Sequence, residues 1–396
     1  MSAALLEQHL ASVARLAPLI ATHAADAERE RRLPQPIVRA MTEAGLFRLY
    51  VPHSLGGSQL SPLEFAEILE ALSRIDGSTG WCAFIGNVNT LFTTPMLPAS
   101  IERIFLDQPG TVTGSAFFPF GRAVRTDGGF RLSGRWQFAS GCQHCRWYFV
   151  LCQEYEGGEP QFSASGVPLT RACFLPLEAY TIEETWDVSG LSGSGSHDVI
   201  LDDVFVPQDM TWIFGRSMRP DPKHFGAPVY RHPPYATGVM QAGFIGIGIA
   251  QGAIDHAMEI AQSKLGVGTS TPLRERPTFH IGLADAVALV RGSRAWLREA
   301  LAEFEQAVMA GQEVSYESRA NMMLAATKAM HNSARATDIV YSLCGANANY
   351  RKNPLQRALR DVHAATQHFA VAINQVESAG RMMVGLEPLA PPVILG

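Results

Sequence analysis

Two cysteines with a histidine between them, Cys142, His144 and Cys145, are the residues in this sequence whose spacing first suggests chemistry. A Cys-x-x-Cys pair can bind zinc when a second group of ligands follows at a similar spacing, or it can work as a redox dithiol at the start of a helix. Only the isolated Cys152 follows here, and the neighbouring residues alternate like those of a strand. We therefore interpret the pair as packed thiols and predict no metal site.

A second pattern, Gly246-x-Gly248, matches part of a dinucleotide-binding fingerprint. That fingerprint needs a strand directly before the glycines, because the turn between strand and helix holds the phosphates. Here the glycines lie inside the apolar run 238–264, which has the length and composition of a buried helix. We predict that they allow helices to pack closely, and the sequence contains no pattern typical of a nicotinamide site.

The composition is that of a globular enzyme. The chain has 396 residues, of which 47% are hydrophobic and 17% charged, so it can form two or three domains. The net charge of −5 and the lack of a basic cluster argue against nucleic acid as a partner. The six cysteines show no disulfide framework, the segment 1–20 is too polar for a signal peptide, and no apolar stretch is long enough for a membrane span. We therefore expect a cytoplasmic protein.

The elements that would position functional residues are organised around a β block, Gly129–Pro207. Its first part, Phe130–Val150, alternates like two short strands joined through Phe138–Cys142. Its last part has a loop rich in Gly and Ser, Gly190–Ser196, followed by a strand that ends at Pro207. The pattern predicts a central β domain over 110–210.

Helices are expected on both sides of this block. An N-terminal helical domain, 1–109, is predicted to contain helices near 4–24, 35–45, 61–74, 76–92 and 98–106. In the C-terminal part, 211–396, a loop over 208–235 is expected to lead into helices near 238–264, 278–311, 314–344 and 354–380. The fold class is therefore α+β, and the long apolar helices at the end suggest a bundle that also forms an oligomer interface.

This organisation resembles the acyl-CoA dehydrogenase superfamily across nearly the whole chain. The stretch Met41–Gly57 and the stretch Trp186–Pro207 match motifs of that superfamily. Within it, the chain is most similar to the flavin-dependent monooxygenases, the oxygenase components of two-component systems that hydroxylate aromatics or oxidise heteroatoms. The features of that branch are SGRWQFASGCQHCRW, GLSGSGSHD and NPLQRALRDVHAATQH. The resemblance implies a β-barrel-like central domain, a C-terminal four-helix bundle and a homotetramer.

The position of the catalytic base separates the two branches. A dehydrogenase must remove a proton from the carbon beside a thioester, and for this it needs a positioned carboxylate. Counted from Arg360-Asp361, the family position of that Glu falls on Phe369, and no Asp or Glu occurs between Asp221 and Asp255, where the other known base would lie. The residues therefore favour the monooxygenase branch.

That branch binds reduced FMN or FAD, forms a flavin hydroperoxide with O2, and transfers one oxygen atom to the substrate. A dry pocket, a hydrogen bond at the reactive edge of the flavin and a nearby imidazole protect the intermediate. The matching residues are Ser140, in the turn after the first strands, and His368, in the last helix, with His363 as the second candidate. The alternatives are that Ser140 bonds its own backbone and that His368 is an ordinary core or surface histidine.

One departure bears on the substrate. Phenol hydroxylases of the branch carry a His eight residues after the Trp that matches Trp81, as a base for the phenol, and this chain has Asn89 there. An Asn side chain can hydrogen-bond a substrate, but it cannot take a proton at neutral pH. Either the substrate needs no deprotonation, as with an indole or a heteroatom, or another residue performs it. A milder departure is Ser192, where relatives often have Arg.

The resemblance also implies contacts to cofactor and substrate. The residues expected at the flavin are Trp81, Phe138, Ala139, Ser140, Trp186, Ser194 and Ser196, and a neighbouring subunit is expected to supply Arg274, Arg276, Cys344, Gly345 and Ala346. Those expected at the substrate are Ser115, Phe117, Phe118, Arg231 and Tyr235. For the aromatic residues the alternative is simple core packing, and for Arg274 and Arg276 it is solvated charge at the start of a helix.

The sequence therefore predicts a flavin-dependent monooxygenase component that hydroxylates a small aromatic or oxidises a heteroatom. The reduced flavin would come from a separate NAD(P)H-dependent flavin reductase. Two alternatives remain open at this point: a dehydrogenase or oxidase of acyl thioesters with a displaced base, and a flavin-free helical assembly protein on an inherited fold.

Overall fold

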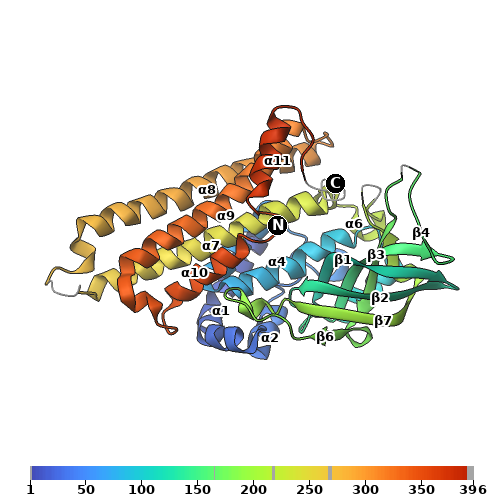
Figure 1. Ribbon diagram of the computed structural model, residues 1–396, viewed down its shortest axis with the longest axis horizontal. Coiled ribbons are helices and arrows are strands. Elements are labelled where there is room, and N and C mark those ends of the chain that lie inside the picture. The colour runs from blue at the N-terminus through green and yellow to red at the C-terminus, as the bar shows by residue number, and fades with distance from the viewer. Residues whose placement is uncertain (1, 165, 216–218, 266–269, 390–396) are drawn as a thin grey trace.

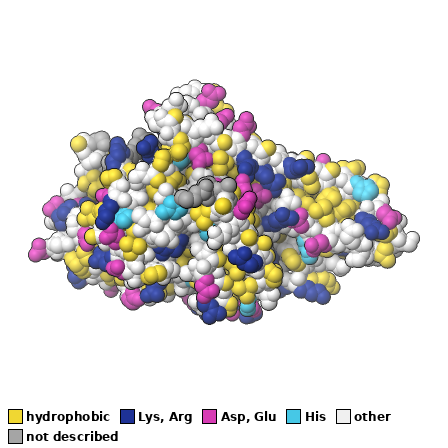
Figure 2. Space-filling view, turned by 180° about the vertical axis from the view of Figure 1, so that it is seen from behind, with side chains coloured by type: hydrophobic (Ala, Val, Ile, Leu, Met, Phe, Trp, Pro, Cys, Tyr) yellow, Lys and Arg dark blue, Asp and Glu magenta, His cyan; other side chains and the backbone are white. Residues whose placement is uncertain are grey.

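The computed structural model describes residues 2–164, 166–215, 219–265 and 270–389. A bundle of long helices forms one end of the molecule and a twisted sheet forms the other, with the N-terminal helices packed between and beneath them (Figure 1). On the face shown in Figure 2, acidic and basic side chains are interspersed with hydrophobic ones, as the small net charge leads one to expect.

The N-terminal helices begin and end near the predicted residues, except that the first continues to Glu30 where its end was predicted near residue 24. They are α1 (Ser2–Glu30), α2 (Gln35–Glu43), α3 (Pro62–Ile75), α4 (Gly77–Phe92) and α5 (Pro98–Phe105). Ser61 begins α3 with a reciprocal capping box, in which its hydroxyl accepts from the Glu64 amide and the Glu64 carboxylate accepts from the Ser61 amide. Asp76 caps α4 by accepting from the Thr79 amide at 2.8 Å. Every residue of α4 except Ile85 is buried, because this helix is surrounded by the other layers.

The central domain is one mixed sheet. Its strands are β1 (Thr113–Thr126), β2 (Gly129–Ala139), β3 (Trp147–Glu156), β4 (Glu159–Pro160), β5 (Thr170–Pro176), β6 (Thr181–Glu183), β7 (His197–Pro207) and β8 (Thr211–Ile213). The order is β6-β7-β2-β1-β3-β5-β8, with β4 paired to β3. The two strands predicted on either side of Phe138–Cys142 are β2 and β3, but they are not neighbours, because β1 lies between them and runs parallel to β3.

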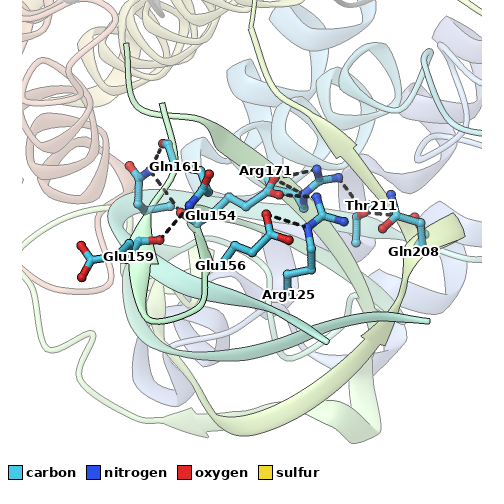
Figure 3. Close-up of polar contacts among 9 residues, drawn as sticks. Arg125, Glu154, Glu156, Glu159, Gln161, Arg171, Gln208 and Thr211 are labelled. Carbon is cyan, nitrogen blue, oxygen red and sulfur yellow. Dashed lines mark hydrogen bonds and ion pairs between the residues drawn. The ribbon is translucent and has the colours of Figure 1, made fainter. Parts of the chain in front are cut away.

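A buried ion pair ties the strands together at one end of the sheet (Figure 3). The Glu154 carboxylate on β3 and the Arg171 guanidinium on β5 are 2% and 5% exposed, and Arg171 Nη2 donates to Glu154 Oε2 at 2.6 Å. Arg171 also donates to the Thr211 hydroxyl on β8 at 3.1 Å, and Arg125 on β1 forms a second ion pair with Glu154. Arg171 further lies 4.3 Å from the centre of the Phe130 ring. This network therefore joins β1, β3, β5 and β8.

The segment 208–235 is not the plain loop that was predicted. It contains β8, which pairs with β5, the short helix α6 (Pro222–Phe225) and 3₁₀ turns over Gln208–Met210 and Pro228–Arg231. The main-chain hydrogen bonds of β8 to β5 explain why this part is ordered, since a local pattern of three residues is too short to predict a strand.

The C-terminal bundle consists of α7 (Pro234–Ser263), α8 (Pro277–Met309), α9 (Tyr316–Cys344), α10 (Pro354–Ala365) and α11 (Asn374–Met383). A Cβ added at Gly246 would lie 2.8 Å from Met330 Sδ, and one at Gly248 would lie 2.5 Å from the Glu70 carbonyl oxygen. The predicted close packing is thus confirmed. The helix α7 is long and apolar enough to cross a membrane, but 89% of its most apolar window is buried inside the protein, which makes it a core helix.

The single helix predicted over 354–380 is wrong. The chain leaves the helical path after Ala365 and forms turns before α11 begins at Asn374. Two side chains compete with the helical hydrogen bonds there. The Thr366 hydroxyl donates to the His363 carbonyl oxygen at 2.6 Å, and His368 Nδ1 accepts from the Ala370 amide at 3.4 Å.

Candidate active site

A cavity of about 340 Å³ lies where the three parts of the chain meet. It is enclosed by α4, by β1 and β2, by the segment from Trp186 to Ser196, by the start of α7 and by the turn after α10. Among the lining residues that the structure describes, none is Asp, Glu, Lys or Arg. The predicted site residues in this lining are Trp81, Asn89, Ser115, Phe117, Phe118, Phe138, Ser140, Trp186, Ser194, Ser196, Tyr235 and His368.

A chain of buried hydroxyls lies along one wall. The Trp81 indole N–H donates to Ser140 Oγ at 3.1 Å, Ser140 Oγ lies 2.7 Å from Ser196 Oγ, and Ser196 Oγ lies 2.7 Å from Ser194 Oγ. The main chain joins the same segments, since the Gly141 amide donates to the Ser194 carbonyl oxygen at 2.8 Å. The Ser140 hydroxyl therefore bonds side chains of two other segments, and Ser140 lines the cavity.

His368 lies in the turn after α10, and not in a helix as predicted. Its ring meets the Trp81 ring edge-on at 5.1 Å, and burial lowers its pKa to about 4, so the imidazole is neutral at pH 7. Because Nδ1 accepts from the Ala370 amide, the remaining proton is on Nε2. The second candidate, His363, is exposed and bonds Asp338 at 2.8 Å, outside the cavity lining.

Asn89 is held at the other end of the cavity. The Ser115 hydroxyl donates to Asn89 Oδ1 at 2.6 Å, and the Tyr148 hydroxyl donates to the Ser115 carbonyl oxygen at 2.7 Å. Asn89 is 3% exposed, and its Nδ2 has no hydrogen-bond partner among the described residues. The same is true of the Tyr235 hydroxyl, whose ring stacks on Phe369 at 5.9 Å. The lining therefore offers two buried polar atoms that nothing in the described chain satisfies.

Aromatic rings form most of the remaining wall. Phe117 packs edge-on against Phe92 at 5.3 Å, so it belongs to the core as well as to the lining. Phe118 is 42% exposed, and Phe138 is 67% exposed although its ring meets Trp186 at 6.1 Å. Phe138 also has a left-handed φ of 58°, which non-glycine residues seldom adopt. Such exposed rings beside an apolar cavity are typical of a surface that a planar ligand covers.

The remaining predicted residues lie elsewhere. Ala139 is buried beneath the lining, and Arg231 is exposed outside it. The residues that a neighbouring subunit was expected to supply gather at the far end of α7. There Arg274 donates to Gln262 at 3.4 Å, and Lys264 donates to the Cys344 carbonyl oxygen. This group is Arg274, Arg276, Cys344, Gly345 and Ala346. With a helical rise of 1.5 Å per residue, Gln262 lies about 40 Å along α7 from Tyr235, so the group cannot reach the cavity of its own chain.

The two cysteines of the Cys-x-x-Cys pair lie behind the Ser140 turn. Both are buried, and Cys142 Sγ donates to the Gly195 carbonyl oxygen at 3.6 Å. Burial raises the pKa of Cys142 to about 12, which keeps its thiol protonated at pH 7. The two thiols are packed in the core, as we interpreted them from the sequence.

One positioning residue was missed from the sequence. In the sequence, Asp361 was used only as the point from which the position of the dehydrogenase base was counted. In the structure it is buried and accepts from the Leu191 amide at 2.6 Å. The loop that carries Leu191 presses against α10, since a Cβ at Gly190 would lie 2.1 Å from the Arg360 carbonyl oxygen. The Arg-Asp pair in a helix facing a Gly-rich loop could have suggested this contact. Asp361 therefore fixes the loop that forms part of the cavity wall.

The buried Asp361 carboxyl group should make the stability of the protein depend on pH. Burial, with a smaller effect of the Asp76 carboxylate, raises the pKa of Asp361 to about 7 from its ordinary 3.8, against the opposing charges of Arg357 and Arg360. Since the folded chain holds this proton more tightly, the stability it contributes is complete below pH 4 and is lost as the pH rises to 7. We expect Asp361→Asn, which keeps an acceptor for Leu191, to gain thermal stability relative to the wild type over that range.

Thermal unfolding of both proteins at several pH values between 4 and 8 measures this. Asp202→Asn, at an exposed site on β7, is the control and should show a constant difference from the wild type. A difference for Asp361→Asn that does not change with pH would contradict the assignment.

Comparison with known proteins places these features in context. Two family models match the chain, one for the acyl-CoA dehydrogenase N-terminal domain over residues 8–99 and one for the acyl-CoA dehydrogenase C-terminal domain over residues 240–373. An indole-3-acetate monooxygenase of Pseudomonas putida is 30% identical over 362 residues, which cover 91% of this chain and 90% of that protein.

Two further similarities extend over nearly the whole length. The oxygenase component of an FADH2-dependent resorcinol hydroxylase from Rhizobium sp. is 31% identical over 393 residues, covering 95% of this chain and 94% of that protein. The structure of XiaF from Streptomyces sp., in complex with FADH2 and glycerol, superimposes with a TM-score of 0.90 at 27% identity, covering 98% of both chains.

Proposed function

The chain belongs to the acyl-CoA dehydrogenase superfamily and, within it, to the flavin-dependent monooxygenases, and from this premise we propose how its cavity performs oxygenation. The enzyme uses reduced FMN or FAD and O2 to place one oxygen atom on a small aromatic substrate, an indole-like ring being the first candidate. A separate NAD(P)H-dependent reductase supplies the reduced flavin, as expected for an oxygenase component. The six cysteines of the present chain are free and buried, which supports a location in the reducing cytoplasm.

The observation that carries this proposal is the absence of a carboxylate from the described lining of the cavity. Phe369 stands where a dehydrogenase would have its Glu, between the rings of His368 and Tyr235 at 4.4 and 5.9 Å. Removal of a proton from an acyl thioester would need a base at this place. A ring of carbon atoms cannot act as one, so the acyl-thioester alternative has no catalytic group, while an oxygenation needs a dry and apolar pocket.

The residues of the cavity fit a flavin ring. The exposed ring of Phe138 and the half-buried ring of Trp186, which meet edge-on, offer apolar surface to a flavin. Trp81 is buried, and Ser140 offers a hydroxyl already fixed by Trp81 and Ser196. We propose that the flavin ring binds against these residues and against the main chain at Ala139. The Ser194 and Ser196 hydroxyls lie beside the proposed cofactor site and support Ser140 through hydrogen bonds between Ser194 and Ser196 and between Ser196 and Ser140.

Each polar residue then has a separate task. When bound, the reduced flavin supplies the electrons that activate O2 and the means of delivering one oxygen atom. The Ser140 hydroxyl orients the cofactor. His368, neutral and protonated at Nε2, donates a hydrogen bond and does not remove a proton. Asn89 and Tyr235 hold the substrate, and the aromatic wall excludes water.

The far end of the bundle suggests how a complete site is built. Arg274 is exposed, Arg276 is half-buried, and guanidinium groups suit a phosphate. Since they lie about 40 Å along α7 from the cavity of their own chain, we propose that they serve the cavity of a neighbouring subunit. The exposed Ile281 and Tyr350, 65% and 62% accessible, support a subunit contact at this end, and a homotetramer is the proposed assembly.

The test uses flavin reduced without any reductase. The protein is mixed anaerobically with reduced FAD or FMN and indole, and ¹⁸O2 is then admitted. We expect an organic product that gains one ¹⁸O atom, the second atom leaving as water with the two electrons of the flavin and two protons. If no ring compound gains oxygen and acyl-CoA instead bleaches a bound oxidised flavin, the proposal is wrong and the dehydrogenase alternative holds.

A further inference from the structure

We propose that the cavity selects uncharged aromatic substrates that carry a hydrogen-bond acceptor, and that Asn89 makes this selection by donating from Nδ2 to that acceptor. The inference rests on the proposed function and deepens it, since it names the class of substrate. An amide or carbonyl group on an indole-like ring is the chemistry that the site would recognise.

The first support is the position of Asn89 within the cavity. Trp81, Ser140 and His368 gather at one end, with the Trp81 and His368 rings 5.1 Å apart. Asn89 lies two turns further along α4, about 12 Å from Trp81 for a rise of 1.5 Å per residue. Its neighbours there are Ser115 on β1 and aromatic rings. The amide therefore belongs to the end of the cavity away from the residues assigned to the cofactor.

The second support is the hydrogen bonding of the Asn89 amide. Its Oδ1 already accepts from Ser115, and Ser115 is itself fixed through Tyr148. This contact orients the amide and leaves the Nδ2 donor without a partner among the described residues. A buried donor without a partner is costly, and a ligand acceptor that satisfies it gains that free energy back. The site is thus built to receive an acceptor atom.

The third support is the charge of the lining. No cationic side chain faces the cavity within the described residues, and Arg231, the predicted substrate contact, is exposed outside it. His368 is neutral at pH 7. A substrate carboxylate would therefore lose its hydration and find no opposite charge, which strongly disfavours its binding. A neutral amide of the same shape meets no such penalty, and the Tyr235 hydroxyl can offer it a second hydrogen bond.

The experiment compares two compounds that differ mainly in charge, indole-3-acetamide and indole-3-acetate, with plain indole as the reference. Product formed at saturating reduced FAD gives kcat/KM, and calorimetry on the protein without turnover gives the Kd of each compound. We expect the wild type to prefer the amide over the acetate by at least tenfold in both measurements. Equal or better use of the acetate would overturn the inference, and so would a failure of the amide to bind.

Variants test the role of Asn89. Asn89→Leu removes the donor, and we expect it to lower kcat/KM for the amide about tenfold more than kcat/KM for plain indole, which has no acceptor to place there. Asn89→Asp replaces the donor with an acceptor and should lose the amide as well. Asn374→Asp adds the same charge at an exposed site at the start of α11 and is the control. An amide preference that survives both Asn89 variants, in proteins with unchanged thermal unfolding, would overturn the role of Asn89.

The experiment distinguishes a failure of the proposed function from a failure of the proposed selectivity. If the amide binds and the acetate does not, but no compound gains oxygen, the proposed function fails while the selectivity of the cavity stands. If oxygenated product forms from the acetate as readily as from the amide, the function stands and the proposed selectivity fails.

Discussion

Replacing His368 by alanine lowers the yield of oxygenated product by about a hundredfold, in our expectation, while reduced flavin is still consumed. The reason is the place of this imidazole. It lies against Trp81, it is kept neutral by burial, and its Nδ1 is occupied by the Ala370 amide, so one donor remains at Nε2 on a residue of the cavity lining. Without that donor and its ring, water enters and the electrons leave as hydrogen peroxide instead of reaching the substrate.

The measurement is the ratio of product to hydrogen peroxide for each reduced flavin consumed. His363→Ala is the matched control, because His363 is exposed, bonds Asp338 and lies outside the cavity lining. The pH gives a second readout. Since the pKa of His368 is about 4, the imidazole stays neutral above pH 5, and the product ratio should be constant from pH 6 to 8. An unchanged ratio in His368→Ala would remove His368 from the mechanism.

The second large effect concerns stability. Glu154→Gln is expected to lower the free energy of unfolding by about 3–5 kcal/mol, because Arg171 is then left as a buried charge without its counter-ion. Arg125 cannot compensate, since it too is a cation that pairs with Glu154. Equilibrium unfolding in urea measures the change.

A neighbouring position supplies the control for this prediction. Glu156, on the same strand, is 60% exposed in its side chain and pairs with Arg125 at 3.8 Å, so Glu156→Gln should cost no more than about 1 kcal/mol. The double variant Glu154→Leu/Arg171→Met removes both buried charges and should recover most of the loss. None of these residues lines the cavity, and activity per folded molecule should remain. A cost for Glu154→Gln no larger than for Glu156→Gln would contradict the role given to the network.

The sequence determined the features that depend on near neighbours along the chain. Ser61 and Asp76 begin helices because a side chain reaches an amide three residues ahead, and that spacing is visible in any sequence. The order of helical, strand and helical blocks followed from periodicity in the same way. Matching motifs then predicted Phe369 at the position of the missing base, and Phe369 lies in the cavity lining.

Tertiary structure decided what depends on contacts between distant segments. Whether the 354–380 helix breaks, so that His368 turns toward Trp81, is settled by packing against α4 and by competing side-chain hydrogen bonds. The Asn89 amide is oriented by the Ser115 hydroxyl, 26 residues away, which donates to its oxygen. No periodic pattern encodes such a contact, since residues far apart in the chain meet only when the whole core closes around them.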